Sequence, residues 1–280
     1  MDTLHFERYE YKYFVPEPLT SDVRRFIRPY VVADEHARRA AAGRYTIYNL
    51  YLDTPRFDLY DACVGGALDR FKLRIRWYDE AARGPFFFEV KRKIRQVVRK
   101  DRARVSFDEL AAIARGDVPV LAYGRARDNL AAFLDRVALH GAEPCVLTRY
   151  TREAYESVFA DYARLTFDRS MAFQPARGWR LPGDPRGWMY TDAARDTEAV
   201  RGATMIELKF TRAFPRWMSD LVAEFGLERV GYSKYIASVR ATLETAHGLP
   251  DFERVAVARF APAEPRRAPH WRPIYAVAEA

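Results

Sequence analysis

Three short segments of this chain each place a glutamate two residues before a lysine. The pairs are Glu10 with Lys12, Glu89 with Lys91, and Glu207 with Lys209. Each pair lies in a run rich in aromatic and β-branched residues, which is typical of strands. Because successive strand side chains alternate between faces, each glutamate shares one face with its lysine. Three such pairs indicate strands that line a common charged interior, suited to a polyanion and its metal ion.

Further cations follow the same two-residue spacing. Lys72, Arg74 and Arg76 alternate with apolar residues in the clearest strand pattern of the chain. For a single strand, a polar face in water explains this pattern as well as a binding site does. Across several strands that explanation weakens, because like charges repel each other unless an anion lies between them. We therefore expect the charged faces to bind an anion and the apolar faces to be covered by helices.

The strands that carry these residues are predicted from alternation, and the helices from capping signals and apolar periodicity. Strands are expected over residues 6–15, 45–52, 71–78, 86–94, 97–105, 146–154, 163–169 and 204–210. Helices are expected over residues 20–28, 126–140, 215–225 and 233–247, and another begins at Ser106. Ser106 and Glu109 have the spacing of a capping box, and Gly141 suits a helix C-terminus. Residues 174–188 are predicted to form a loop.

The composition narrows the class of protein. The chain has 280 residues, 49% of them hydrophobic, and a formal net charge of +8. It is long enough for one large domain, and its charge favours a partner that carries phosphates. Two cysteines, Cys63 and Cys145, exclude a disulfide framework and a four-cysteine metal site. No apolar run has the length of a signal peptide or of a membrane span, so we expect a cytoplasmic protein.

Several short motifs, taken together with their order and spacing, resemble those of a known family. They lie at residues 8–13, 51–54, 73–78, 88–91, 164–168, 206–209 and 233–235. Through them the chain resembles the catalytic domain of the vacuolar transporter chaperone (VTC) family, as far as about Ala246. That family makes polyphosphate and belongs to the triphosphate tunnel metalloenzymes. The resemblance implies an α+β fold with a closed, eight-stranded antiparallel β-barrel, the triphosphate tunnel, covered by helices. We expect this domain over residues 1–248 and a loosely ordered tail over residues 249–280.

The resemblance also implies the site residues. We expect phosphates to be bound by Lys12, Arg74, Arg76, Lys91, Arg104, Arg152, Arg164, Lys209 and Lys234. Lys100 or Arg102 would serve in place of Arg104 if the strand register differs. Arg74, Arg76 and Glu207 are the expected catalytic residues. Glu207 falls where the family binds its metal, and Glu10 is a second candidate ligand. Mn²⁺ or Mg²⁺ suits such oxygen ligands.

Three positions depart from the family patterns. Arg8 stands where the wider tunnel superfamily often has a glutamate, which favours the VTC branch over the triphosphatases. Gly231 stands where a lysine is expected, so one substrate contact is missing or is supplied by a neighbour such as Arg229. An expected arginine near Cys63 is also absent. Either of the two missing basic residues could weaken or alter the activity.

The implied function is a polyphosphate polymerase that transfers the γ-phosphate of ATP to a growing polyphosphate chain. A triphosphatase that cleaves inorganic or nucleoside triphosphates on the same fold is the nearest alternative. The third possible function is that of a non-catalytic module that binds polyphosphate, inositol phosphates or RNA. Nucleic acid is the least favoured ligand, because the aromatic residues alternate out of phase with the charges and so cannot be interleaved with them. For Glu89 we favour a different role, which is to relieve repulsion among the cations, and for Glu10 this role and metal binding are equally favoured.

Overall fold

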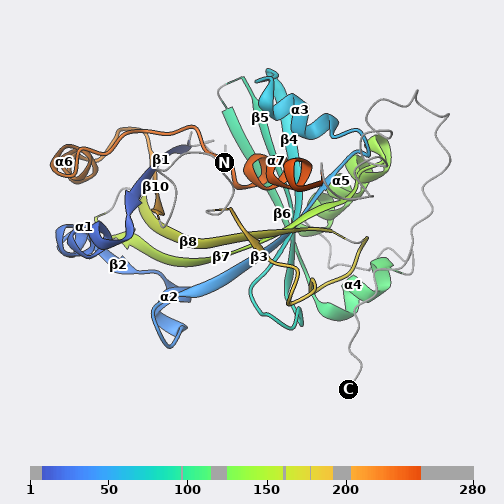
Figure 1. Cartoon of the computed structure of the whole chain (residues 1–280), viewed down its shortest axis with the longest axis horizontal. Coiled ribbons are helices and arrows are strands. Elements are labelled where there is room, and N and C mark those ends of the chain that lie inside the picture. The colour runs from blue at the N-terminus through green and yellow to red at the C-terminus, as the bar shows by residue number, and fades with distance from the viewer. Residues whose placement is uncertain are drawn as a thin grey trace. The chain divides into compact units, whose positions relative to one another are not determined.

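The structure is a computed structural model that describes residues 8–95, 97–114, 125–159, 162–176, 178–191 and 203–246. These residues form an α+β fold dominated by antiparallel strands (Figure 1). The chain divides into two compact units. Among the described residues, the first unit contains residues 8–46, 149–159, 162–171, 190–191 and 203–233, and the second contains residues 47–95, 97–114, 125–148, 172–176, 178–189 and 234–246. Strands β3, β7 and β8 each contribute residues to both units.

The described residues contain the following strands and helices. The strands are β1 Arg8–Pro16, β2 Val31–Ala33, β3 Tyr45–Asp53, β4 Asp69–Trp77, β5 Phe86–Ile94, β6 Val97–Val105, β7 Glu143–Ser157, β8 Ala163–Pro175, β9 Met189–Tyr190 and β10 Ala203–Thr211. The helices are the 3₁₀ helix η1 Glu17–Leu19 and the α-helices α1 Thr20–Ile27, α2 Glu35–Arg39, α3 Asp58–Val64, α4 Phe107–Ala114, α5 Arg125–His140, α6 Arg216–Glu224 and α7 Lys234–Ala246.

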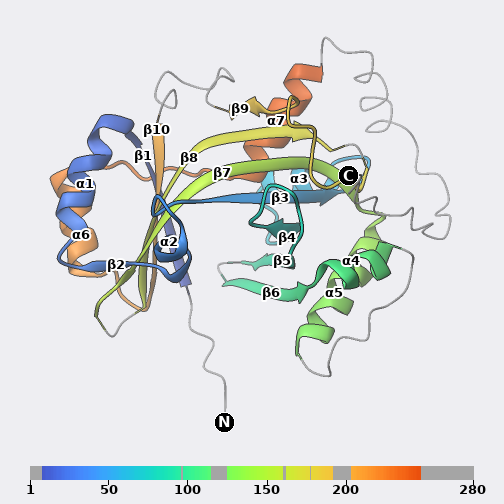
Figure 2. The same ribbon diagram turned by 90° about the horizontal axis from the view of Figure 1, so that it is seen from below.

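In the first unit the strand order is β1-β10-β8-β7, and β2 pairs with β7. Strands β1 and β10 are antiparallel along their whole length, from Arg8 opposite Thr211 to Pro16 opposite Ala203. The apolar face is covered by α1 and α6, which lie side by side (Figure 2). Its core contains Val23, Ile27, Leu165, Phe167, Ile206, Leu208, Met218 and Leu221. The other face of these strands carries the charged residues.

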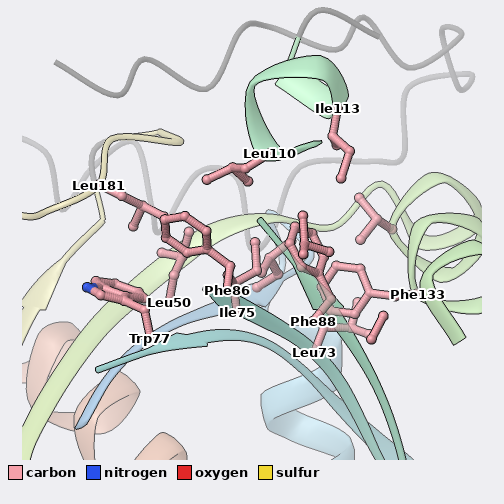
Figure 3. Close-up of a cluster of buried hydrophobic side chains, with 14 of the residues drawn as sticks. Leu50, Leu73, Ile75, Trp77, Phe86, Phe88, Leu110, Ile113, Phe133 and Leu181 are labelled. Atoms are coloured by element: carbon pink, nitrogen blue, oxygen red, sulfur yellow. The ribbon is translucent and has the colours of Figure 1, made fainter. Parts of the chain in front are cut away.

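The second unit contains four consecutive antiparallel strands in the order β3-β4-β5-β6. Figure 3 shows the apolar face of these strands, where Leu110 and Ile113 of α4 and Phe133 of α5 meet the strand side chains. The rings of Phe88 and Phe133 lie 5.1 Å apart in an edge-to-face arrangement. Burial of Leu73 on the same face leaves its neighbours, Lys72 and Arg74, on the opposite face.

Two of the predicted helix ends are confirmed. The amide of Ser106 donates to Glu109 Oε2 at 2.6 Å, and the amide of Glu109 donates to Ser106 Oγ at 3.2 Å, which is the expected capping box. Gly141 follows α5 with a φ of 58°, a left-handed conformation that glycine adopts without steric cost. These local signals therefore determine where α4 begins and where α5 ends.

Helix α3 was not predicted, because its sequence has no clear helical period. The buried carboxylate of Asp53 accepts hydrogen bonds from the amides of Leu59 at 2.9 Å and Tyr60 at 3.0 Å. It thereby satisfies amide groups in the first turn of α3, which have no partner within the helix. The short elements β2 and α2 were missed as well.

The expected closed barrel is not confirmed. The strand order β1-β10-β8-β7-β3-β4-β5-β6 contains eight strands in succession, but it has two ends, at β1 and β6. The antiparallel α+β class was predicted correctly. The predicted tail over residues 249–280 lies outside the described residues. Among the residues that are described, no helix is both long enough and apolar enough to cross a membrane.

Candidate phosphate-binding site

In the first unit, the register of three strands brings several predicted site residues together. Lys12 of β1 lies opposite Glu207 of β10, which lies opposite Thr166 of β8. Two residues further along each strand, on the same face, Glu10 lies opposite Lys209, and Lys209 lies opposite Arg164. Directly opposed residues of antiparallel strands share one face. The sequence predicted the face of each residue, and the register now places them in two adjacent rows.

Glu207 is the carboxylate on which the cations of this unit converge. Its Oε2 atom accepts from Lys209 Nζ at 2.8 Å and from Arg152 Nη2 at 3.2 Å. Its Oε1 atom lies 4.0 Å from Lys12 Nζ. Burial lowers the pKa of Lys209 and the positive charge of Arg152 adds to this shift, although Glu207 and Glu10 oppose it. Glu207 is therefore held in place by three cations.

Arg152 has a second acidic partner that the sequence did not reveal. Asp168 of β8 is fully buried and is matched to Arg152 in a two-pronged ion pair. Burial alone would lower the pKa of Arg152, but the charges of Asp168 and Glu207 outweigh it and raise that pKa well above its usual value. The guanidinium is thus permanently charged and rigidly oriented.

Lys12 is held by the loop that precedes α7. Its Nζ donates to the carbonyl oxygen of Tyr232 at 2.8 Å and lies 3.1 Å from Glu10 Oε1. The backbone oxygen of Lys12 accepts from the amide of Val230 at 2.8 Å. This loop contains Gly231, where the resemblance predicts a lysine, so a lysine there would begin next to Lys12.

Arg229 does not replace that missing lysine. Its guanidinium carbon lies 3.9 Å from the centre of the Tyr11 ring. Tyr11 and Lys12 are consecutive residues of β1, so their side chains point to opposite faces. Arg229 therefore lies on the face away from Lys12 and Glu207. The expectation that it supplies the missing contact was wrong, because the loop directs its side chain to the other side of the strand.

Arg164 is engaged by carboxylates outside the predicted site. Its Nη2 atom donates to Asp34 Oδ2, and its Nη1 atom lies 3.3 Å from Glu156 Oε1. Asp34 also caps α2 by accepting from the amide of Ala37 at 2.7 Å. The role of Asp34 was not predicted, because it lies 130 residues from Arg164 along the chain. The assignment of Arg164 to phosphate binding stays a prediction.

In the second unit, the register arranges the remaining cations in three rows across β4, β5 and β6. The rows are Lys72-Lys91-Lys100, Arg74-Glu89-Arg102 and Arg76-Phe87-Arg104. The first row sets three lysines directly beside one another, and like charges in such positions destabilise a sheet. Seven cations therefore surround a single carboxylate in these rows. An anionic ligand would relieve that repulsion.

Glu89 is the carboxylate at the centre of these rows. Its Oε1 atom lies 2.6 Å from both Lys100 Nζ and Arg102 Nε, and its Oε2 atom accepts from Arg74 Nε. Burial opposes ionisation of Glu89, but Arg74 and the other cations outweigh it and hold the pKa far below its usual range. Burial, and then the charge of Arg74, lower the pKa of Lys100 to about 6. These contacts agree with the role considered for Glu89, which is to relieve repulsion among the surrounding cations.

Arg76 is buried, and one of its partners is the side-chain amide of Asn49. Its Nε atom donates to Asn49 Oδ1 at 2.9 Å, and Asn49 Nδ2 donates to Thr148 Oγ1 at 3.1 Å. The nearby charges of Arg74 and Arg76 lower the pKa of Tyr51 even though burial raises it. Asn49 was not predicted, since an amide within an apolar strand gives no signal of its own.

The remaining predicted residues have different environments. Lys91 lies within the lysine row of the second unit, and Arg104 lies exposed at the end of the Arg76 row. Lys100 and Arg102, the alternatives to Arg104, share its face and bind Glu89. Lys234 is the first residue of α7. Its neighbour Tyr235 donates to Asp53 Oδ2, which ties the start of α7 to the turn before α3.

The residues around Glu207 fit a hard divalent cation. The described residues contain no group of three or more His, Cys, Asp or Glu side chains that could enclose a metal ion. Mg²⁺ typically needs only one or two carboxylates, with phosphate and water oxygens completing its shell. Glu207 is such a carboxylate, and Glu10 lies on the same face of the neighbouring strand. The buried hydroxyl of Thr166, opposite Glu207, has no hydrogen-bond partner among the described residues. Its oxygen is therefore a further candidate metal ligand.

Comparison with known proteins gives a family match. The family model described as VTC domain matches residues 7–243. Among curated proteins there is no match. The chain is similar to the PH1819 protein from Pyrococcus horikoshii OT3, with 11% identity over 85% of this chain and 98% of that chain and a TM-score of 0.41. It is also similar to the putative adenylyl cyclase HpAC1 from Hippeastrum, described as having a dominant triphosphatase activity, with 16% identity over 84% and 96% of the two chains and a TM-score of 0.42.

Proposed function

Because the chain belongs to the VTC domain family, we propose that it is a polyphosphate polymerase that transfers the γ-phosphate of ATP to a growing polyphosphate chain. The observation that carries the proposal is the excess of cations on the charged strand faces. In the second unit, seven cations share a strand face with Glu89 and three of them contact it. In the first unit, Lys12, Arg152 and Lys209 surround Glu207. A ligand with several adjacent negative charges, such as a triphosphate, complements such faces.

Arginine and lysine contribute differently to phosphate binding. Arg74 and Arg76 carry planar guanidinium groups, which form two parallel hydrogen bonds to phosphate oxygens. Lys12 and Lys91 carry compact charges on flexible stems and can follow a phosphate that moves. Phosphoryl transfer depends mainly on positioning and on neutralising charge as the bond to the leaving group loosens. We therefore assign Arg74 and Arg76 to the reacting triphosphate.

A divalent metal ion is part of the proposal. Glu207, with Glu10 as a second ligand, would hold Mn²⁺ or Mg²⁺, and the bound ion would neutralise charge on the phosphate oxygens. In the free protein three basic side chains lie close to Glu207, so the metal ion would bind together with the phosphates, whose charges neutralise these cations. Substitution of Glu207 should therefore remove catalysis without removing all phosphate binding, because the arginines and lysines remain.

The acceptor would be the terminal phosphate of the polyphosphate chain. This phosphate is already ionised at neutral pH, so the reaction needs no strong general base. The lysines and arginines of the protein would hold the donor and acceptor phosphates close together. A cytoplasmic location is part of the same proposal, since ATP is the phosphate donor.

The direct test incubates the purified protein with ATP, Mn²⁺ and a short polyphosphate primer and resolves the products by length on a gel. We expect a ladder that lengthens with time and is absent in Glu207→Gln. Glu224→Gln, which removes an exposed carboxylate of α6, is the matched control and should leave the ladder intact. Release of free phosphate without chain growth would overturn the polymerase in favour of a triphosphatase. Metal-independent binding without turnover would indicate a binding module.

A further inference from the structure

A second cluster of arginines lies on the helix-covered side of the first unit. Glu153 and Arg169 follow Arg152 and Asp168 directly in β7 and β8, so their side chains lie on the opposite face from the Glu207 cluster. Arg24 of α1 reaches Glu153 from this side, and Figure 2 shows α1 beside these strands. None of these residues belongs to the phosphate-binding site described above.

Glu153 is fully occupied by its partners. It accepts from Arg24 Nε at 2.7 Å and Nη2 at 3.1 Å, and from the hydroxyl of Tyr155 at 2.5 Å. Arg44 Nε lies 3.5 Å from the same carboxylate. Burial opposes the charge of Glu153, but Arg24 and its other partners lower the pKa below its usual value. The pair of Arg24 and Glu153 is thus explained by its structural role, which is to fasten α1 to the sheet.

Arg169 has no comparable explanation. Its side chain is 12% exposed, and its Nε and Nη2 atoms are buried without a hydrogen-bond acceptor among the described residues. The nearest carboxylate contacts are 3.5 Å, from Nη1 to Glu17, and 3.8 Å, from Nη2 to Glu153. Nε and Nη2 form the edge with which a guanidinium makes fork-shaped bonds to an oxyanion. Buried donors of this kind are rare in native proteins and normally have a water or ion as partner.

The charges around this edge are unbalanced. Three arginines, at positions 24, 44 and 169, face two carboxylates, those of Glu17 and Glu153. Burial lowers the pKa of Arg169, and the charges of Arg44 and Arg24 add to that effect while Glu17 opposes it. Glu17 and Arg44 are about half exposed and form the outer rim of the cluster. The rim can therefore exchange its contacts with solvent ions, while Arg169 lies beneath it.

We propose that Arg169 and Arg44 form a second anion-binding site, which takes a small phosphate-type oxyanion. The two oxygens of such an anion would accept from Nε and Nη2 of Arg169, and Arg44 would add a charge at the rim. Glu17 competes with the anion because it lies beside Arg169 and carries the same charge as the ligand. Free inorganic phosphate and the terminal phosphate of a polyphosphate chain present this same chemistry.

The site predicts opposite effects for two rim substitutions. Glu17→Gln removes the competing charge but retains hydrogen-bonding capacity, so it should tighten phosphate binding about threefold. Arg44→Gln removes an attractive charge and should weaken binding by a similar factor. Arg25→Gln removes an arginine from the solvent side of α1 and should have no effect. A purely structural network predicts no phosphate binding at Arg169 in any of these proteins.

The measurement follows the side-chain Nε–H resonance of Arg169 by NMR, assigned from its loss in Arg169→Lys. Titration with inorganic phosphate should shift this resonance saturably, with affinities ordered Glu17→Gln, wild type, Arg44→Gln. A parallel titration with short polyphosphate distinguishes the two sources, since the chain end is the ligand if it binds more tightly. An unshifted resonance, or equal affinities in the two rim variants, would overturn the proposal. Because the readout is local to Arg169, it is independent of the polymerase activity.

Discussion

Arg152 and Asp168 form a two-pronged ion pair, in which Nε donates to Oδ1 and Nη2 donates to Oδ2, each at 2.6 Å. Both side chains are buried, so neither charge is compensated by water. A buried charge that loses its partner is strongly destabilising. The pair also sets the direction of the remaining Arg152 contact to Glu207, 3.2 Å away. Asp168 is therefore a positioning residue for the charged face of the first unit.

The first prediction concerns this pair. Asp168→Asn keeps the shape of the side chain but leaves the Arg152 charge unpaired, so the free energy of unfolding should fall by about 3 kcal/mol. Urea unfolding measures this change. Asp101→Asn, which removes the carboxylate that pairs with the exposed Arg99, should cause little change. Equal stability of the Asp168→Asn and wild-type proteins would mean that the pair is dispensable.

The second prediction concerns Glu89. Glu89→Gln removes the only carboxylate among three cations that contact it, so the free energy of unfolding without ligand should fall by about 3 kcal/mol. Tripolyphosphate should then stabilise the variant more than it stabilises the wild type, because the ligand supplies the missing negative charge. Thermal unfolding with and without tripolyphosphate tests both parts. An equal or smaller ligand effect in the variant would contradict the proposed role of these cations.

The third prediction concerns proton uptake by Lys100. Its pKa of about 6 in the free protein means that it is mostly neutral at pH 8, whereas bound phosphate would restore its charge. Calorimetric titration with tripolyphosphate in two buffers of different ionisation enthalpy should show uptake approaching one proton at pH 8 and little at pH 5. Lys100→Met should abolish the difference, while Lys93→Met should retain it. Identical proton uptake in Lys100→Met and wild type would assign the proton elsewhere.

The same shift has a consequence for stability. The unfolded lysine has its ordinary pKa of 10.5, so between about pH 6 and that value the unfolded state binds one more proton than the folded state. The contribution of Lys100 therefore makes the free protein more stable as the pH rises through this range. Lys100→Met should flatten the increase, which denaturant unfolding at several pH values measures.

The fourth prediction restores a residue that the family resemblance expects. A side chain at Gly231 meets no atom within 4 Å of its Cβ position, and the flanking residues, Val230 and Tyr232, both bond to Lys12. Gly231→Lys should therefore fold normally and increase tripolyphosphate affinity about fivefold through one added charge. Ser219→Lys adds the same charge to the exposed side of α6 and serves as the control. Equal affinity of both variants would show that position 231 does not contribute to binding.

Local signals account for the elements that were predicted well. Strands β5 and β6 have the bounds that alternation predicted, Phe86–Ile94 and Val97–Val105. The start of α4 was predicted because Ser106 and Glu109 satisfy each other's backbone amides within three residues. Alternation also predicted that Glu10, Lys12, Glu207 and Lys209 lie on charged strand faces, since it depends only on the two-residue period of a strand.

Contacts between distant segments were not predictable from such signals. Arg76 binds Asn49, Arg164 binds Asp34, and Arg229 stacks on Tyr11 away from Lys12. Each of these contacts depends on strand register or on the path of a loop. A shift of register by one residue would move every side chain of a strand to its other face. Sequence spacing therefore could not identify the partners of the candidate phosphate ligands.

The sequence by itself determined which residues are charged, which strand faces carry them, and the VTC family to which the chain belongs. These properties follow from the local period of strands and from motifs that are continuous along the chain. Only the tertiary structure decided that Glu89 and Glu207 each gather three cations and that Arg169 has a buried guanidinium edge without an acceptor among the described residues. Charges interact over a few ångströms in space whatever their separation in sequence, so the arrangement of these charges required the fold.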